Sequence, residues 1–296
     1  MKLATYFTTD TIHQNGEFQD LGYAEHKGNQ ILTFCDNINY LKVALENSEI
    51  SSVIITNNML PYLNNTNKGI AISNNPRKFF FDIYNKMRDE ELFNIKNGYG
   101  RCNSSKISTS AIVSKKSYIG DNTIISENVV IKDNVFIGDN CFIDVGVIIG
   151  NEGVLHTYDE DENIAFIKHA GVVEIGDNVT LLANSVIVKS VFPNMPTRVS
   201  DFSIIGIATA IGHEANISKN CKILGNCVVA KNVKIMDNTI VGSSSVIREN
   251  LTLGANVNVM AGSIVVKDVI ENQSVSGNFA INHSQNVKNH FKLIRS

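Results

Sequence analysis

One histidine of the chain, His213, lies where an imidazole could take part in chemistry. It comes two residues after Ile211, at the polar end of a short apolar segment. A histidine titrates near neutral pH, so it can accept a proton from a reacting group as a general base. Glu214 follows directly, and its carboxylate could orient the imidazole or be a solvated charge at a corner.

The chain on both sides of His213 repeats every six residues. Aliphatic side chains occupy every sixth position from Ile107 to Ile149 and, after a break, from Ile175 to Val265, with Pro193 as the exception. A small or β-branched residue precedes each by two positions, and Gly-Asp-Asn turns follow several of them. Each hexad is therefore a short strand plus a corner. Three hexads close a coil of eighteen residues, and stacked coils bury one continuous core.

The period also defines the domain organisation. Residues 107–270 are predicted to form a parallel β-helix, interrupted by a loop excursion at 150–174 and a smaller one at 188–198. Residues 1–95 carry no hexads and alternate strand-like with helix-like patterns, which predicts a small α/β domain. A linker at 96–106 joins the two, and a short, partly helical tail follows the prism. The predicted fold class is mainly β.

The composition limits the partners of the chain. With 43% hydrophobic and 19% charged residues, its 296 residues predict a globular protein of roughly two domains. A net charge of -3 without a local lysine or arginine cluster argues against nucleic acid. No apolar run of eighteen residues and no signal-peptide pattern occurs, so we expect no membrane span and a cytoplasmic location.

The cysteines indicate neither a disulfide framework nor a zinc site. They are odd in number, widely spaced and free of CxxC pairs. Three of them fall on the inward small-residue position of the hexads and are predicted to be structural thiols: Cys141, Cys221 and Cys227.

The segment around His213 resembles a known enzyme family. The run IGHEANISKNCKI (211–223) is similar to the histidine-bearing turn of the UDP-3-O-acylglucosamine N-acyltransferases of lipid A synthesis. His213 falls on the catalytic histidine of that family. Segments 72–80, 148–153 and 168–178 also follow the family in order. The resemblance implies a left-handed β-helix and a homotrimer, in which the groove between neighbouring prisms encloses the corner histidine.

The resemblance also implies roles for single residues. His213 would be the general base that takes the proton of a sugar amine as the amine attacks a thioester. Lys231 lies eighteen residues later and so one coil above, where its backbone N–H would face the oxyanion; the family usually has glycine there. The run LTFCDNINYLK resembles the family's uracil-binding turn, in which aromatic rings stack on the base and an amide reads its edge. The matching residues are Phe34, Asn37 and Tyr40.

Several positions depart from the family and leave the acyl donor open. Glu214 replaces an asparagine, and Asn250 lies where these enzymes often carry a second histidine. Asn278 belongs to VSGNFA, which resembles the close of many coenzyme-A-dependent acetyltransferases. His156 and His169 on the first excursion could contact the substrate or the donor. The donor is expected to be an acyl carrier protein with a hydroxy fatty acid, or coenzyme A with a short acyl group.

These observations predict an N-acyltransferase acting on a UDP-linked amino sugar, without a tightly bound cofactor or metal. One alternative is an acetyl-CoA-dependent N-acetyltransferase of a nucleotide-linked amino sugar for O-antigen or capsule. A second is a non-catalytic or metal-binding β-helix protein. The metal-binding type needs several converging histidines, whereas the hexads contain only His213.

Overall fold

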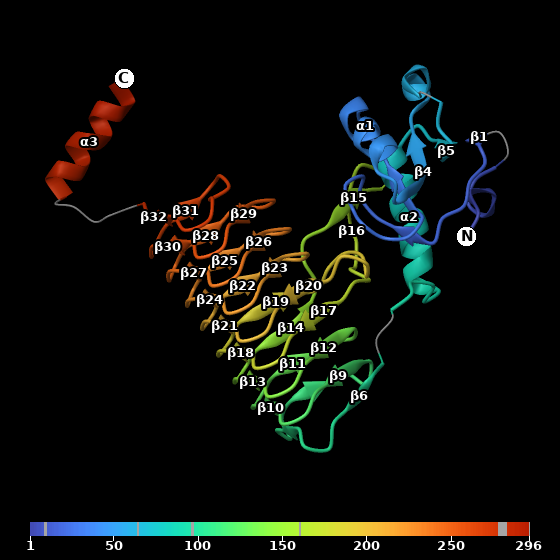
Figure 1. The fold of residues 1–296 in the computed structure, drawn as a ribbon. Coiled ribbons are helices and arrows are strands. Elements are labelled where there is room, and N and C mark those ends of the chain that lie inside the picture. Colours follow the sequence, from blue (N-terminus) through green and yellow to red (C-terminus); the bar gives the residue numbers. More distant parts are fainter. Residues whose placement is uncertain (9–10, 64, 96–97, 160, 278–282, 296) are drawn as a thin grey trace.

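A computed structural model describes residues 1–295 except 9–10, 64, 96–97, 160 and 278–282. Figure 1 shows a prism of stacked coils, an N-terminal α/β domain that lies against one side of it, and a C-terminal helix α3 (His283–Arg295) beyond the last coils. The predicted fold class, mainly β with a left-handed β-helix behind a small α/β domain, is confirmed.

The N-terminal domain is built on one sheet with the order β1-β5-β4-β3-β2, in which only the edge strand β1 runs antiparallel to its neighbour. Phe80 and Phe81 pack into its core with no exposed surface. The elements are η1 (Leu3–Thr5), β1 (Ile12–Gln14), β2 (Asp20–Leu21), β3 (Ile31–Phe34), α1 (Ile38–Glu46), β4 (Ile50–Ile55), η3 (Asn57–Tyr62), β5 (Gly69–Ile72) and α2 (Pro76–Asp89).

The β-helix has three faces, each a ladder of parallel two- to four-residue strands. Face 1 holds β7 (Lys106–Ile107), β10 (Ile124–Ile125), β13 (Phe142–Ile143), β18 (Thr180–Leu181), β21 (Ile204–Ile205), β24 (Lys222–Ile223), β27 (Ile240–Val241), β30 (Asn258–Val259) and β32 (Ser274–Val275). Face 2 holds β8 (Ile112–Val113), β11 (Val130–Ile131), β14 (Ile148–Asn151), β19 (Val186–Val188), β22 (Ala210–Ile211), β25 (Val228–Val229), β28 (Val246–Ile247) and β31 (Ile264–Val265). Face 3 holds β6 (Gly100–Arg101), β9 (Ser117–Ile119), β12 (Val135–Ile137), β17 (Val173–Ile175), β20 (Thr197–Val199), β23 (Asn216–Ile217), β26 (Lys234–Ile235) and β29 (Thr252–Leu253).

The coils extend slightly beyond residues 107–270, because β6 and β32 pair with the ladders at the two ends. Paired residues on successive coils lie eighteen apart, as for Ile223 and Val241. The aliphatic residue of each hexad points inward into one continuous core, together with the small-residue series that contains the three predicted structural thiols. Those thiols are buried and unbridged, so the prediction for them is confirmed.

The corners adopt the left-handed backbone conformation that their turn residues predicted. Asparagines at successive corners have φ near +57°, in the left-handed region that asparagine tolerates better than most residues. Their side chains also stack from coil to coil, as where Asn220 Nδ2 donates to Asn238 Oδ1 at 2.8 Å. Backbone and side-chain hydrogen bonds therefore fix the vertical register of each corner.

The two excursions leave the prism toward the N-terminal domain. Ile149 pairs with Ile187, and Ile175 with Val199, so the numbers of the paired residues differ by more than eighteen at both places. The first excursion is more ordered than the predicted loop, because it contains an antiparallel hairpin of β15 (His156–Tyr158) and β16 (Ile164–Phe166). Apolar residues of both excursions are buried in the N-terminal core, among them Leu155, Ile167 and Phe192.

Candidate functional site

A cavity of about 250 Å³ lies between the N-terminal domain, the first excursion and one corner of the coils. The corner follows β22 and carries His213, the residue singled out in the sequence. Because the other domain covers this corner, the His213 side chain is not on the outside of the prism: the residue is only 9% exposed. The single chain therefore already encloses the imidazole in a cavity.

Glu214 is buried beside His213, not solvated. One carboxylate oxygen, Oε2, lies 3.5 Å from His213 Nδ1, a distance that suits an ion pair with a protonated ring better than a strong hydrogen bond. The other oxygen accepts a hydrogen bond from the Val191 backbone N–H at 3.3 Å. Burial raises the pKa of Glu214, but hydrogen bonding and charge from His213, with a contribution from His26, outweigh burial and hold that pKa below its ordinary value.

The backbone of Glu214 is unusual for its residue type. Its φ is +62°, at a corner where asparagine is common in this chain. Its N–H donates to Thr197 Oγ1 at 2.8 Å, which helps to hold the turn. A long side chain in left-handed backbone costs free energy, and such strain gathers at functional sites. The residue is thus held with its carboxylate beside the imidazole.

A second histidine, which the hexad pattern did not include, contacts the first. The rings of His169 and His213 meet edge to face, with centroids 5.1 Å apart and planes at 79°. Gly153 lies against both rings: a Cβ there would come within 2.9 Å of His169 Cε1 and 3.2 Å of His213 Cδ2. The sequence signal for His169 was only its place on the excursion, since it belongs to no coil.

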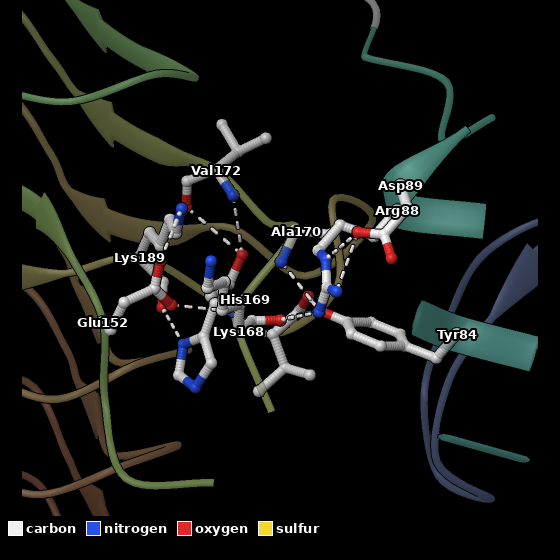
Figure 2. A network of polar contacts seen from close by, with 11 residues as sticks. Tyr84, Arg88, Asp89, Glu152, Lys168, His169, Ala170, Val172 and Lys189 are labelled. Carbon is white, nitrogen blue, oxygen red and sulfur yellow. Dashed lines mark hydrogen bonds and ion pairs between the residues drawn. The ribbon is translucent and has the colours of Figure 1, made fainter. Parts of the chain in front are cut away.

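A network of polar contacts connects His169 to the N-terminal domain (Figure 2). The His169 backbone N–H donates to Glu152 Oε2 at 2.7 Å, and Lys189 Nζ lies 3.1 Å from Glu152 Oε1. Tyr84 of α2 accepts a hydrogen bond from the Ala170 N–H at 2.7 Å, and its hydroxyl proton faces the carbonyl oxygens of Lys168 and Val191 at 3.0 and 2.9 Å. Both excursions are therefore fixed to α2 and to each other.

Lys231 lies one coil above His213, as the eighteen-residue spacing predicted. The N–H of Asn232 donates to the His213 carbonyl at 3.0 Å, which fixes the two corners in register. The close stacking of the two corners requires glycine at position 212, because a Cβ there would come within 2.7 Å of the Lys231 backbone nitrogen. Within the described part of the chain, no acceptor receives the Lys231 backbone N–H. Lys231 also lines the cavity.

Two of the three residues expected to bind uracil line this same cavity, namely Phe34 and Tyr40. Asn37 does not line it. Its Oδ1 accepts the Tyr40 backbone N–H at 3.0 Å and so caps the N-terminus of α1, as short polar residues commonly do. The structure adds Arg77, whose guanidinium carbon lies 5.9 Å from the Phe34 ring centroid. Arg77 belongs to the 72–80 stretch, but no motif in the sequence marked it as a site residue.

Of the remaining residues expected at the site, some line the cavity and others do not. Asn250 lines the cavity, one coil above Lys231. His156 is not among the lining residues; its ring packs edge-on against Tyr158, and its carbonyl accepts from Arg77 Nη2 at 3.3 Å. Asn278 lies outside the described residues. The described part of the chain contains no group of three histidine, cysteine or acidic side chains arranged to hold a metal ion. None of its helices is long and apolar enough to cross a bilayer.

One protein-family model matches part of the coils. Residues 214–249 match the family model of the bacterial transferase hexapeptide repeat (six repeats). None of the curated proteins compared with the chain matches it. Over these residues, the match agrees with the predicted enzyme of the hexapeptide-repeat acyltransferase type.

Solved structures with similar coils include the UDP-N-acetylglucosamine acyltransferase of Francisella novicida (22% identity, 64% of this chain and 73% of that chain, TM-score 0.39). The enzyme of the same name from Campylobacter jejuni has 20% identity over 65% of this chain and 83% of that chain, with a TM-score of 0.48. A mutant of perosamine N-acetyltransferase from Caulobacter crescentus, in complex with CoA and GDP-perosamine, has 17% identity over 77% and 67%, with a TM-score of 0.23.

The buried histidines predict a loss of stability on acidification. Burial lowers the pKa of His26 and of His169, so below about pH 6.5 the unfolded chain binds protons that the folded chain does not. The free energy of unfolding should therefore fall as the pH drops from 7 to 5, by up to about 1.4 kcal/mol per pH unit for each such proton. The lowered pKa of Glu214 also makes the free energy of unfolding fall on acidification, but at a lower pH, near the ordinary pKa of a carboxyl group.

Denaturant unfolding at several pH values measures this dependence. The variant His26→Asn should show a shallower slope between pH 7 and 5 than the unmodified protein. The matched variant His13→Asn, at an exposed position of β1, should keep the original slope. An unchanged slope in His26→Asn would contradict the assignment of a neutral buried ring.

Proposed function

We propose that the protein is an N-acyltransferase that transfers an acyl group from a thioester donor to the amine of a UDP-linked amino sugar. The observation that carries the proposal is the shared cavity: the aromatic residues Phe34 and Tyr40 and the buried base His213 line one space. An acceptor with a flat nucleobase at one end and an amine at the other would contact the aromatic residues and His213 at the same time. Arg77 of α2 and Lys231 of the coils also line this space, and their positive charges could bind a diphosphate.

The proposed reaction needs one base and one oxyanion donor. The amine nitrogen attacks the thioester carbonyl carbon, and His213 accepts the amine proton as the C–N bond forms. Collapse of the tetrahedral intermediate breaks the C–S bond, and the imidazolium returns its proton to the leaving thiolate. Glu214 stabilises that imidazolium from 3.5 Å. The backbone N–H of Lys231 is the proposed donor to the oxyanion.

Replacing the base tests the proposal directly. His213→Ala should lower kcat by at least about a hundredfold, since general-base catalysis is commonly worth about 10² to 10⁴. Purified protein is assayed with a UDP-amino sugar and either hydroxyacyl carrier protein or acetyl-CoA, so that the same assay also identifies the donor. Circular dichroism checks that the coils remain folded. Retained turnover in a folded His213→Ala would remove this residue from the mechanism.

The aromatic residues should act on binding more than on chemistry. Phe34→Ala and Tyr40→Ala each remove a ring surface that we assign to the nucleobase, so the KM for the nucleotide sugar should rise about tenfold while kcat changes little. Steady-state kinetics with the nucleotide sugar varied at saturating donor separates the two constants. Equal losses in kcat at unchanged KM would argue against base stacking at these residues.

We also propose that the chain assembles as a homotrimer through face 2. In each strand of face 2, the residue that precedes the inward aliphatic residue is apolar, whereas the corresponding residues of face 3 include charged and amide side chains. Large contiguous apolar surfaces mark interaction sites, and a second and third copy would cover this one. The outward ladder of face 2 runs through Ile112, Val130, Ile148, Val186, Ala210, Val228, Val246 and Ile264.

Sedimentation measures the assembly. The unmodified protein should sediment at three times 32.5 kDa. Val228→Glu should shift it toward the single chain, because the substitution buries a carboxylate in the contact. Lys234→Glu on face 3 is the matched control and should leave the mass unchanged. A monomeric unmodified protein at micromolar concentration would exclude the trimer.

A further inference from the structure

His169 lies at the boundary of two cavities. His213 lines the cavity of about 250 Å³ described above, whereas His169 lines a second cavity of about 480 Å³ that contains Glu152 and Lys189. The two imidazoles are in edge-to-face contact, so the pair of rings forms part of the wall between the two spaces. His169 is only 2% exposed, and its ring shields one side of the His213 ring from solvent.

The hydrogen bonds of His169 fix its tautomer. Its Nδ1 lies 2.9 Å from the Lys189 carbonyl oxygen, which can only accept, so Nδ1 carries a proton. In the neutral ring Nε2 then has a lone pair. Nε2 is buried and has no hydrogen-bond partner among the described residues. A ring held in this way can rotate little without losing its hydrogen bond in a site that excludes water.

Burial favours the neutral ring of His169 by lowering its pKa, and the neighbouring His213 acts in the same direction. Glu152 approaches it, but the Lys189 ammonium lies 3.1 Å from that carboxylate and balances it. His213 and the buried Glu214 lie on the other side of the His169 ring. The Glu214 carboxylate is 3.5 Å from His213 Nδ1. A proton on His169 would place a second positive charge beside an imidazolium at His213. The Lys189 carbonyl and the Glu152 and Glu214 carboxylates raise the pKa of His169, but they do not outweigh burial.

We propose that His169 is a positioning residue for the base of the acyl transfer: its fixed, uncharged ring sets the orientation of His213 and keeps water of the second cavity away from it. This inference rests on the proposed function. The proton taken from the amine then stays on His213, where Glu214 stabilises it. Gly153 is part of the same arrangement, because any larger residue would push the two rings apart.

Two substitutions separate the ring from its hydrogen bond. His169→Asn keeps an N–H near Nδ1 that can donate to the Lys189 carbonyl, but it removes the ring. His169→Phe keeps the ring contact with His213, but it removes the donor. Steady-state kinetics of both variants, with kcat expressed per folded protein, is compared with that of His13→Asn on the exposed strand β1.

We expect kcat of His169→Asn to fall about tenfold to a hundredfold, with the KM for the nucleotide sugar within about twofold, because a misplaced base slows chemistry without weakening binding. His169→Phe should recover a large part of the lost kcat. A purely structural role would instead lower the melting temperature of both variants and leave kcat per folded protein unchanged, and that result would overturn the proposal.

A second measurement does not depend on activity. In protein labelled with ¹⁵N-histidine, one imidazole should be neutral with its proton on Nδ1 at neutral pH and should titrate below the ordinary histidine range, and its signals should be missing in His169→Asn. That variant, but not His13→Asn, should also shift the His213 signals, which are identified by their loss in His213→Ala. A His169 ring that titrates near pH 6.5 or carries its proton on Nε2 would overturn the proposal. If the unmodified protein is inactive with every donor, the proposed function fails, and the spectra alone decide the position and charge of His169.

Discussion

The docking of α2 onto the two excursions is the interaction on which the site depends. The hydroxyl of Tyr84 is buried and faces backbone groups from both excursions at once. Buried polar groups of this kind are costly when unpaired, so the three segments can hardly separate without exposing them to water. This docking covers the corner that carries His213 and turns an exposed turn of the prism into a cavity wall.

The same docking determines the local electrostatics. In an isolated prism Glu214 would be an ordinary corner carboxylate. Here its oxygens face a backbone N–H from the second excursion and the neighbouring imidazole, and His26 from the other domain lines the same cavity. The carboxylate thereby stays ionised although it is buried, because the groups that compensate for lost water are supplied by three separate segments.

Much of the fold was readable from the sequence because its signal is local and repeated. Every sixth residue must face inward, so the hexads predicted the coils, the inward thiols and the position of Lys231 above His213. The rest depended on contacts between segments that share no period. The hairpin inside the first excursion, the ring contact of His169 and the approach of Arg77 to the cavity arise only when the domains pack. For Asn37, the local rule for helix caps accounts for its Oδ1 in the structure.

The regular stack of the coils has one more consequence. The cavity is lined by the corners at His213, Lys231 and Asn250, by the first excursion and by the N-terminal domain, and none of its lining residues comes from the coils nearest α3. Each coil adds one strand spacing, about 4.8 Å, to the height of the prism. The number of coils therefore sets how far the prism extends beyond the cavity, and this length changes in steps of eighteen residues.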